Sequence, residues 1–283
     1  MYSSLLRVIP PIVSGVDTLR ARVALVTGAA RGQGRAHAVA LARAGADVAV
    51  CDLGRTLPTV PYALGSVAEL GETAALVQAE GRRCISSVVD VRDAAALAEL
   101  VEETVAELGR LDILVANAGV ISYGKAWELS EAQWDEVVDV NLTGVWKSCR
   151  AAVPAMLAGG EGGAIVITAS TASVKGLAGM SHYAAAKHGC VGLARSLALE
   201  LAPHRIRVNC VAPGGVRTPM GTNTAMQQLL EQDPALAASL TAALPVDLVE
   251  PEDVSAAVVW LCSDAARQVT GTVLPLDAGT LLR

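Results

Sequence analysis

Tyr183 and Lys187 lie four residues apart in this 283-residue sequence and are the pair whose types and spacing best suit chemistry. In a helix this spacing places both side chains on one face, so the Lys187 ammonium can lie close to the Tyr183 phenol. A free tyrosine titrates at about pH 10, and a fixed cation stabilises the phenolate, which brings a phenol toward useful acid and base chemistry. Ser170 lies thirteen residues upstream of Tyr183, at the end of an apolar run. A lone pair with this spacing is more often an ordinary surface pair, so its meaning depends on what accompanies it.

A phosphate-binding loop is predicted at the other end of the same domain. Residues 27–34 (TGAARGQG) follow the apolar run 23–26 and open a helix expected from about 33 to 43. Glycines let the backbone approach a pyrophosphate, and the free N–H groups at a helix start bind its charge. Glycines also mark ordinary turns, but the order strand, loop, helix favours a dinucleotide. The candidate contacts are Gly28, Arg31, Gly32, Gln33 and Gly34.

Asp52 ends a second expected strand, 47–52, and is placed to bind the adenosine ribose hydroxyls of a dinucleotide. Its carboxylate would repel a 2′-phosphate by about 4 kcal/mol at 4 Å and an effective dielectric constant of 20. Arg31 could attract that phosphate, but an exposed cation contributes only about 0–1 kcal/mol. The alternative for Asp52 is a carboxylate that only caps its strand. Together the two residues predict NAD rather than NADP as the cofactor.

The elements that must position these residues alternate between strand and helix. Strands are expected near 22–27, 47–52, 84–90, 111–117, 164–170, 205–212 and 272–277, and helices near 33–44, 67–81, 94–109, 130–158, 182–202 and 252–263. Hydrophobic residues make up 52% of the chain, which suits a parallel sheet covered on both faces. The sequence therefore predicts a single α/β domain over residues 22–283, a Rossmann-type doubly wound parallel sheet of about seven strands.

Composition limits the partners and the compartment. A net charge of −6 predicts neither a nucleic-acid partner nor an anionic membrane surface. Six scattered cysteines without a CxxC pair are typical of a reduced, cytoplasmic protein, and four histidines without ligand spacing predict no metal site. Residues 1–21 are expected to form a flexible extension, or to precede a true start near Val16. Their apolar run is too short to span a membrane and lacks the features of a signal peptide.

Taken together, these motifs resemble the short-chain dehydrogenase/reductase family from about residue 22 to the end. Segments 89–91 (VDV), 117–119 (NAG), 140–142 (VNL) and 213–214 (PG) also match that family in order. The resemblance implies cofactor contacts from Asp90, Val91, Asn117, Gly119, Tyr183, Lys187, Pro213, Gly214, Val216 and Thr218, with Val216 and Thr218 at the nicotinamide carboxamide.

The same resemblance assigns four catalytic roles. It implies that Tyr183 takes the hydroxyl proton of an alcohol as hydride leaves for the nicotinamide, while Ser170 holds the oxyanion. It implies that Lys187 stabilises the phenolate and bonds the nicotinamide ribose. Asn141 would bind a structural water linked to Lys187 and so relay the proton. The alternative for Asn141 is a polar side chain that bonds its own helix backbone.

Two segments are expected to determine specificity, an insertion over residues 53–66 and a substrate lid over 217–251. With residues 28–37 (GAARGQGRAH), 243–245 (ALP) and 276–283 (LDAGTLLR), the insertion resembles the carveol dehydrogenase-like branch, also called mycofactocin-coupled. This branch implies an alicyclic or terpenoid secondary alcohol or ketone, NAD that does not exchange, and an external redox carrier. The lid is expected to contain a helical stretch over 226–231. A loose surface loop is the alternative for the insertion.

Other functions remain open at this stage. An ordinary NAD-exchanging 3-oxoacyl or sugar reductase is one, and a non-catalytic nucleotide sensor on the same fold is another, which the Tyr183 and Lys187 pair argues against. A G-x-S-x-G hydrolase is excluded because residues 179–183 (GMSHY) lack the closing glycine. The family uses the outward faces of helices 130–158 and 182–202 as two-fold interfaces, which implies a homotetramer. Apolar residues on these helices include Val145, Trp146, Val153, Leu193 and Leu197.

Overall fold

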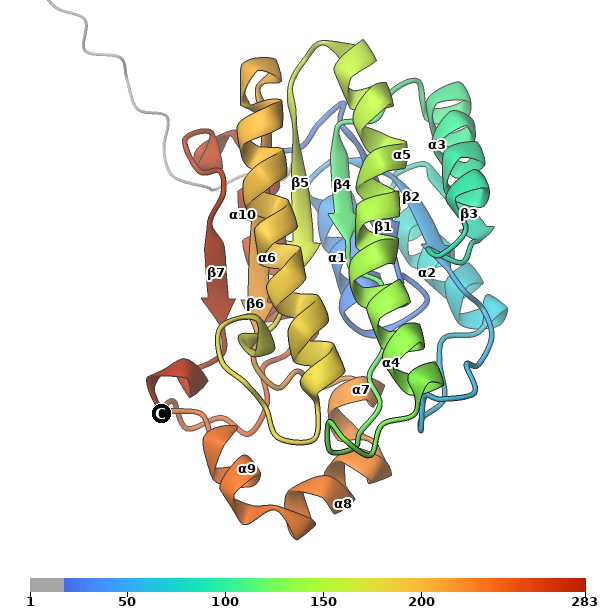
Figure 1. The fold of residues 1–283 in the computed structure, drawn as a ribbon. Coiled ribbons are helices and arrows are strands. Elements are labelled where there is room, and N and C mark those ends of the chain that lie inside the picture. The colour runs from blue at the N-terminus through green and yellow to red at the C-terminus, as the bar shows by residue number, and fades with distance from the viewer. Residues whose placement is uncertain (1–17) are drawn as a thin grey trace, which may run out of the picture.

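Residues 18–283, the part that the computed structural model describes, fold around a seven-stranded sheet of order β3-β2-β1-β4-β5-β6-β7 (Figure 1). Its strands are β1 (Val23–Thr27), β2 (Asp47–Asp52), β3 (Cys84–Val88), β4 (Ile113–Ala116), β5 (Gly163–Thr168), β6 (Ile206–Pro213) and β7 (Val273–Leu276). All of these pairings are parallel, so the predicted doubly wound α/β sheet is confirmed. The strand order reverses between β1 and β4, which is where ligands bind in such sheets.

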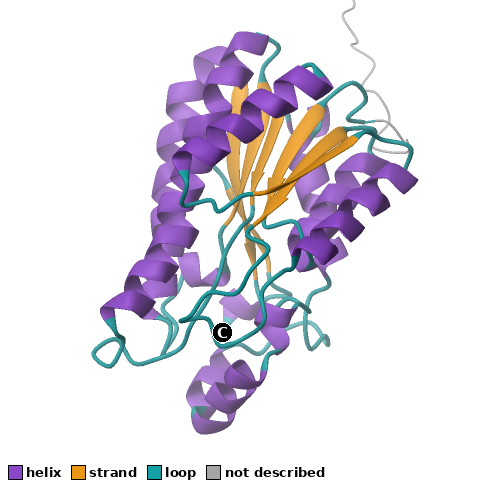
Figure 2. Cartoon of the chain, turned by 90° about the vertical axis from the view of Figure 1, so that its right-hand side faces the viewer, coloured by secondary structure: helices purple, strands orange, loops and turns teal. Residues whose placement is uncertain are grey.

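Helices cover both faces of the sheet (Figure 2). One face carries α1 (Gly32–Arg43), α2 (Val67–Ala79) and α10 (Pro251–Cys262), and the other carries α3 (Ala94–Leu108), α4 (Glu131–Val138), α5 (Gly144–Gly159) and α6 (Ser181–Leu201). Leu25 and Ile165 pack into the core on one side of the sheet, and Val26 and Val166 into the core on the other. Because both faces are covered, β1 and β4 are buried at every residue, and all of their residues except Thr27 are apolar.

The helix predicted over 130–158 contains a π-helical turn, Asp139–Thr143, between α4 and α5. Its start is a capping box, in which Ser130 Oγ accepts from the Gln133 backbone N–H at 3.2 Å. π-helical turns interrupt the regular backbone ladder and frequently occur at functional sites. The turn is centred on Asn141.

The loops that carry candidate site residues gather at the carboxyl ends of the strands. The lid contains α7 (Pro219–Thr222), α8 (Thr224–Gln232) and α9 (Pro234–Ser239), and α8 and α9 lie beyond the strand arrowheads in Figure 1. The predicted helical stretch 226–231 therefore lies within α8.

The N-terminal boundary of the domain stays a prediction, because residues 1–17 lie outside the described part of the chain. Leu19 is buried, and its backbone N–H donates to the Ala44 carbonyl oxygen at 2.7 Å, so packing begins before residue 22. Among the described helices, none combines the length and the apolar character needed to cross a bilayer.

Candidate active site

A cavity of about 510 Å³ opens at the switch point of the sheet and is lined by segments from residue 28 to residue 248. All of the site residues predicted from the sequence line this cavity: Gly28, Arg31, Gly32, Gln33, Gly34, Asp52, Asp90, Val91, Asn117, Gly119, Asn141, Ser170, Tyr183, Lys187, Pro213, Gly214, Val216 and Thr218. The fold thus brings the dinucleotide loop and the Tyr183 and Lys187 pair to one place.

The glycine loop requires two of its glycines for close approach. Gly28 has a φ of +67°, and a Cβ there would lie 2.7 Å from Ala118 Cα; a Cβ on Gly34 would lie 2.0 Å from the Gly28 carbonyl oxygen. Arg31, the N-cap residue of α1, makes no side-chain capping hydrogen bond. The first N–H groups of α1 therefore have no side-chain acceptor at the N-cap and suit an anionic ligand.

Asp52 is held beside this loop. One carboxylate oxygen accepts from the Ala30 backbone N–H at 2.9 Å, which leaves further acceptor capacity directed at the cavity. Arg31, the residue that could attract a 2′-phosphate, forms an ion pair with Glu69 at 3.8 Å. Its charge is therefore partly compensated, which strengthens the electrostatic preference for NAD over NADP.

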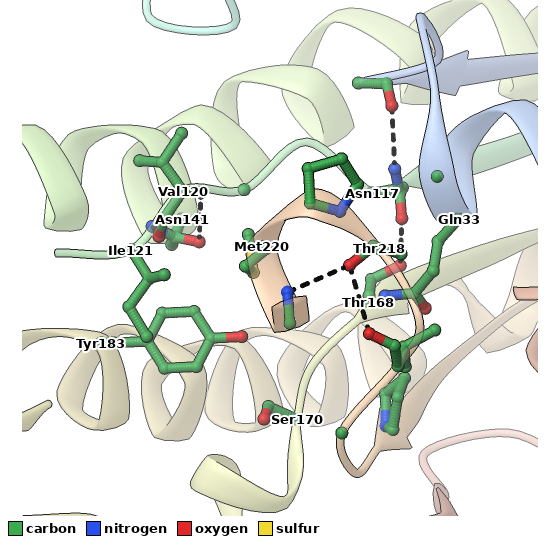
Figure 3. A pocket seen from close by; sticks show the side chains of 18 of the residues that line it. Gln33, Asn117, Val120, Ile121, Asn141, Thr168, Ser170, Tyr183, Thr218 and Met220 are labelled. Carbon is green, nitrogen blue, oxygen red and sulfur yellow. Dashed lines mark hydrogen bonds between the residues drawn. The ribbon is translucent and has the colours of Figure 1, made fainter. Parts of the chain in front are cut away.

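Asn117 joins three strands at the floor of the cavity. Its Nδ2 donates to the carbonyl oxygens of Thr27 at 3.1 Å and Gly28 at 3.2 Å, and its Oδ1 accepts from Thr168 Oγ1 at 3.2 Å (Figure 3). These bonds tie the ends of β1, β4 and β5 together, so the side chain fixes the position of the glycine loop.

Tyr183 and Lys187 occupy one face of α6, as their spacing predicts. Lys187 Nζ lies 5.7 Å from the centre of the Tyr183 ring and donates to the Thr168 carbonyl oxygen at 2.6 Å. The Tyr183 hydroxyl points into the space between Ser170 and Met220 (Figure 3). Ser170 Oγ accepts from the Ala172 backbone N–H at 3.1 Å, so the serine oxygen has a fixed position.

The side-chain amide of Asn141 is fully used by backbone groups. Its Nδ2 donates to the carbonyl oxygens of Val120 at 2.8 Å and Val137 at 2.7 Å, and its Oδ1 accepts from the Val120 N–H at 3.2 Å. Asn141 therefore bonds its own helix backbone, which was the alternative expected from the sequence. It also anchors the loop after β4. Its backbone carbonyl accepts from the Cys190 thiol at 3.0 Å. The assignment of a proton relay to Asn141 stays a prediction.

Asp90, which lines the cavity, is paired with two arginines. Arg92 binds this carboxylate at 2.7 Å and Arg55, from the insertion, at 3.5 Å. Burial opposes ionisation of Asp90, but the hydrogen bonds from Arg92 and the charge of Arg55 hold its pKa below the ordinary value. The insertion and the predicted adenine-contacting segment are thus connected by charge.

The lid contributes an apolar wall. The lid residues that line the cavity and carry large apolar side chains are Met220, Met226, Leu230, Leu240, Val246 and Leu248. Asn223, between α7 and α8, donates to the Tyr123 hydroxyl at 3.3 Å and so connects the lid to the loop after β4.

The insertion packs against the domain, so the alternative of a loose surface loop does not describe it. Leu57 and Val60 are buried in the core, and Thr59 donates to Glu136 Oε2 through its N–H at 3.2 Å and its hydroxyl at 2.5 Å. Leu57, Tyr62 and Leu64 line the cavity, and the sequence motifs identify none of them. The one sequence feature that could have indicated these lining residues is a tyrosine within an apolar, proline-containing loop.

Comparison with known proteins agrees with this geometry. A family model described as enoyl-(acyl carrier protein) reductase matches residues 28–280. The (-)-trans-carveol dehydrogenase of Rhodococcus erythropolis is 48% identical over 271 residues, which cover 93% of this chain and 98% of that protein. Carveol dehydrogenase from Mycobacterium avium in complex with NAD superposes with a TM-score of 0.91 at 44% identity, covering 94% of this chain and 100% of the other. A short chain dehydrogenase from Mycobacterium paratuberculosis bound to NAD has the same TM-score and coverage at 46% identity.

Proposed function

This chain belongs to the short-chain dehydrogenase/reductase family, and we propose that it is an NAD-dependent oxidoreductase that interconverts a secondary alcohol and its ketone. The observation that carries the proposal is that Tyr183, Lys187 and Ser170 line the same cavity as the glycine loop and Asp52. A hydride acceptor bound to the loop and an alcohol oxygen near Tyr183 would then share one enclosed space.

The residues present fit NAD. Gln33 Oε1 is buried at the cavity and has no hydrogen-bond partner among residues 18–283, so a ligand donor would satisfy it. A Cβ on Gly119 would lie 2.8 Å from Asn141 Oδ1, so glycine is required there for the loop after β4 to pack against Asn141 at the cavity wall. The start of α1 would hold the pyrophosphate, and Asp52 the adenosine ribose.

The protein groups supply proton transfer and orientation, while NAD supplies the hydride acceptor. Tyr183 accepts the proton of the alcohol hydroxyl, or returns it to the ketone oxygen in the reverse direction. The Ser170 hydroxyl hydrogen has no acceptor among the described residues, so it is available to the substrate oxygen. Lys187, anchored by the Thr168 carbonyl, keeps a positive charge next to the phenol.

The lining of the cavity favours an alicyclic or terpenoid substrate. Leu177 and Met180 line the same space as the lid residues Met226 and Leu230, and flexible methionines adapt to irregular apolar shapes. The Rhodococcus relative is named for (-)-trans-carveol, an alcohol of this class. A panel of cyclic and linear secondary alcohols, assayed with a dye acceptor, tests the proposal; a preference for short linear alcohols contradicts it.

We further propose that NAD stays bound between turnovers and is reoxidised in place by an external, mycofactocin-like carrier. The support is the packed insertion, which reaches from Asp52 to Asp90 and covers the expected adenosine end. Burial of that end acts mainly on the dissociation rate. The test denatures purified protein, quantifies released nucleotide by mass spectrometry, and compares alcohol oxidation with added NAD alone and with an artificial acceptor. If the purified protein contains no nucleotide and turns over steadily on added NAD, the retained-cofactor proposal is wrong, and the protein is an ordinary NAD-exchanging reductase.

We also propose a cytoplasmic homotetramer. All six cysteines are free thiols, which fits a reducing compartment.

The support for the tetramer lies on the outer helices. Trp146 on α5 is 44% exposed and Leu199 on α6 is 80% exposed, so both helices present apolar side chains outward. Val145, expected to contribute to this surface, is instead only 3% exposed because it packs in the core beside the sheet. A monomer mass near 29.0 kDa in light scattering at micromolar concentration contradicts the tetramer.

A further inference from the structure

Tyr62 carries a phenolic hydroxyl from the insertion to the wall of the cavity. Its oxygen accepts a hydrogen bond from the Ile121 backbone N–H at 3.2 Å. Among residues 18–283, the Tyr62 hydroxyl donates no hydrogen bond of its own. The Tyr62 hydroxyl is therefore held in place as a donor, and the group that it serves must be an acceptor.

The neighbours of this hydroxyl locate it along the cavity. Burial raises the pKa of Tyr62, the nearby phenols of Tyr123 and Tyr183 raise it further, and the Arg31 guanidinium lowers it. The geometry places Tyr62 between two parts of the cavity wall: its hydroxyl lies at the Ile121 N–H after β4, and Gly65, three residues along, packs against Ala30 of the glycine loop. A phenol with a raised pKa keeps its proton at neutral pH, as a donor must.

The rest of the insertion holds Tyr62 in position before any ligand binds. Thr59 bonds Glu136, and a Cβ on Gly65 would lie 2.6 Å from Ala30 Cβ and 3.2 Å from Asp52 Oδ1. The chain on both sides of Tyr62 is therefore attached to the domain. Because the insertion is already ordered in the folded protein, ligand binding loses little free energy to ordering it.

We propose that Tyr62 donates its phenolic hydrogen to an oxygen of the bound dinucleotide, near its pyrophosphate, and thereby closes the insertion over the cofactor. This inference rests on the proposed NAD-dependent function. The start of α1 binds the pyrophosphate and Tyr183 lies at the reacting end, so the central oxygens of the dinucleotide lie between the two. A phosphate or ribose oxygen supplies the acceptor that the hydroxyl lacks, and an anionic acceptor makes the bond strong.

The test compares full-length holoprotein with the Tyr62→Phe variant, which keeps the ring and removes the hydroxyl. We expect the dissociation rate of the bound nicotinamide nucleotide to rise about tenfold or more. The rate is measured as loss of the bound nucleotide from the protein after an excess of isotopically labelled NAD is added to occupy vacated sites. The KM for the alcohol, assayed with an artificial acceptor, should stay within about twofold, since the bond is to the cofactor. Tyr123→Phe is the matched control, because it removes a phenolic hydroxyl that bonds Asn223 in the lid; its nucleotide dissociation rate should equal that of wild type.

Thermal unfolding of both variants reports on folding, and Tyr62→Leu replaces Tyr62→Phe if the latter is insoluble. Equal dissociation rates in wild type and Tyr62→Phe overturn the inference. A raised KM for the alcohol with unchanged nucleotide dissociation also overturns it, because the acceptor is then the substrate. Wild-type protein that binds no nicotinamide nucleotide contradicts the proposed function, and this assignment with it.

Discussion

At the scale of single residues, the candidate catalytic side chains are positioned by backbone groups rather than by one another. Lys187 is anchored by the Thr168 carbonyl, Ser170 by the Ala172 N–H, and Asn141 by both backbone groups of Val120. Backbone partners at strand ends and helix turns move little, so the site is ordered before the ligands arrive. Such preorganisation is what electrostatic stabilisation of a transition state requires.

The first prediction concerns Tyr183. Tyr183→Phe removes the hydroxyl that we propose exchanges a proton with the substrate and keeps the ring, so kcat should fall by at least about 10²-fold. Steady-state kinetics with an artificial acceptor measure the loss, and nucleotide content, unchanged from wild type, is the control. If Tyr183→Phe retains more than a tenth of the wild-type kcat, the catalytic assignment of Tyr183 is wrong.

The second prediction concerns Asp52 and the choice of cofactor. Asp52→Asn removes the negative charge but keeps an oxygen that can accept from the Ala30 N–H. Because about 4 kcal/mol of repulsion toward a 2′-phosphate is lost, the ratio of NADP to NAD bound should rise at least about tenfold. Because bound NAD is proposed not to exchange, the protein is refolded from denaturant with equal NAD and NADP present, and mass spectrometry of the nucleotide then released measures the ratio. Glu69→Gln, which unpairs Arg31, should change it much less, and an unchanged ratio in Asp52→Asn contradicts the argument.

At the scale of elements, long apolar strands and motif spacing made most of the fold and site predictable. The run 23–26 lies in β1, and the NAG and PG motifs follow β4 and end β6 as expected. The sequence does not predict the π-helical turn, and Asn141 at its centre bonds Val120, 21 residues away, a contact that no local pattern records. Tyr62 was missed for the same reason, since its partner Ile121 is 59 residues away and no motif records such pairs.

The third prediction concerns the packing of α1 on α10. His37 is fully buried there, with Nδ1 2.8 Å from Ser255 Oγ, which itself donates to the Pro251 carbonyl. Burial lowers the pKa of His37 from 6.5 to about 3, so protons bind the unfolded chain first as the pH falls. The free energy of unfolding should therefore decrease by about 1.4 kcal/mol per pH unit between these two values, and this loss is absent above them.

Urea unfolding between pH 7 and pH 4 measures this dependence. His37→Asn keeps an amide donor for Ser255 and removes the titration, so its stability at pH 7 should be lower but its slope with pH shallower. The exposed His204 provides the control, and His204→Asn should retain the wild-type slope. A variant at His37 with the full wild-type slope would show that other groups cause the acid sensitivity.

At the scale of the whole molecule, one cavity collects residues from almost every βα connection, while α5 and α6 face outward. In the proposed tetramer, these helices form one kind of two-fold interface and the carboxyl terminus contributes to another. Trp146 lies on the outward face of α5 with Arg150 5.6 Å from its ring centre. A large, partly exposed aromatic side chain on such a face is the residue type enriched at interfaces.

The last prediction follows from that arrangement. In the proposed tetramer, Trp146→Glu places a charge in the contact made by the outward face of α5, so this interface should fail while the other persists. Light scattering should then give a mass of two chains instead of four, with the cavity and its bound nucleotide retained. Trp127→Glu is the matched control, because Trp127 is 80% exposed but lies on the loop before α4, away from the outward faces of α5 and α6. A Trp146→Glu protein with the wild-type mass would exclude α5 from the interface, since a buried, unpaired charge there would cost too much for the interface to remain associated.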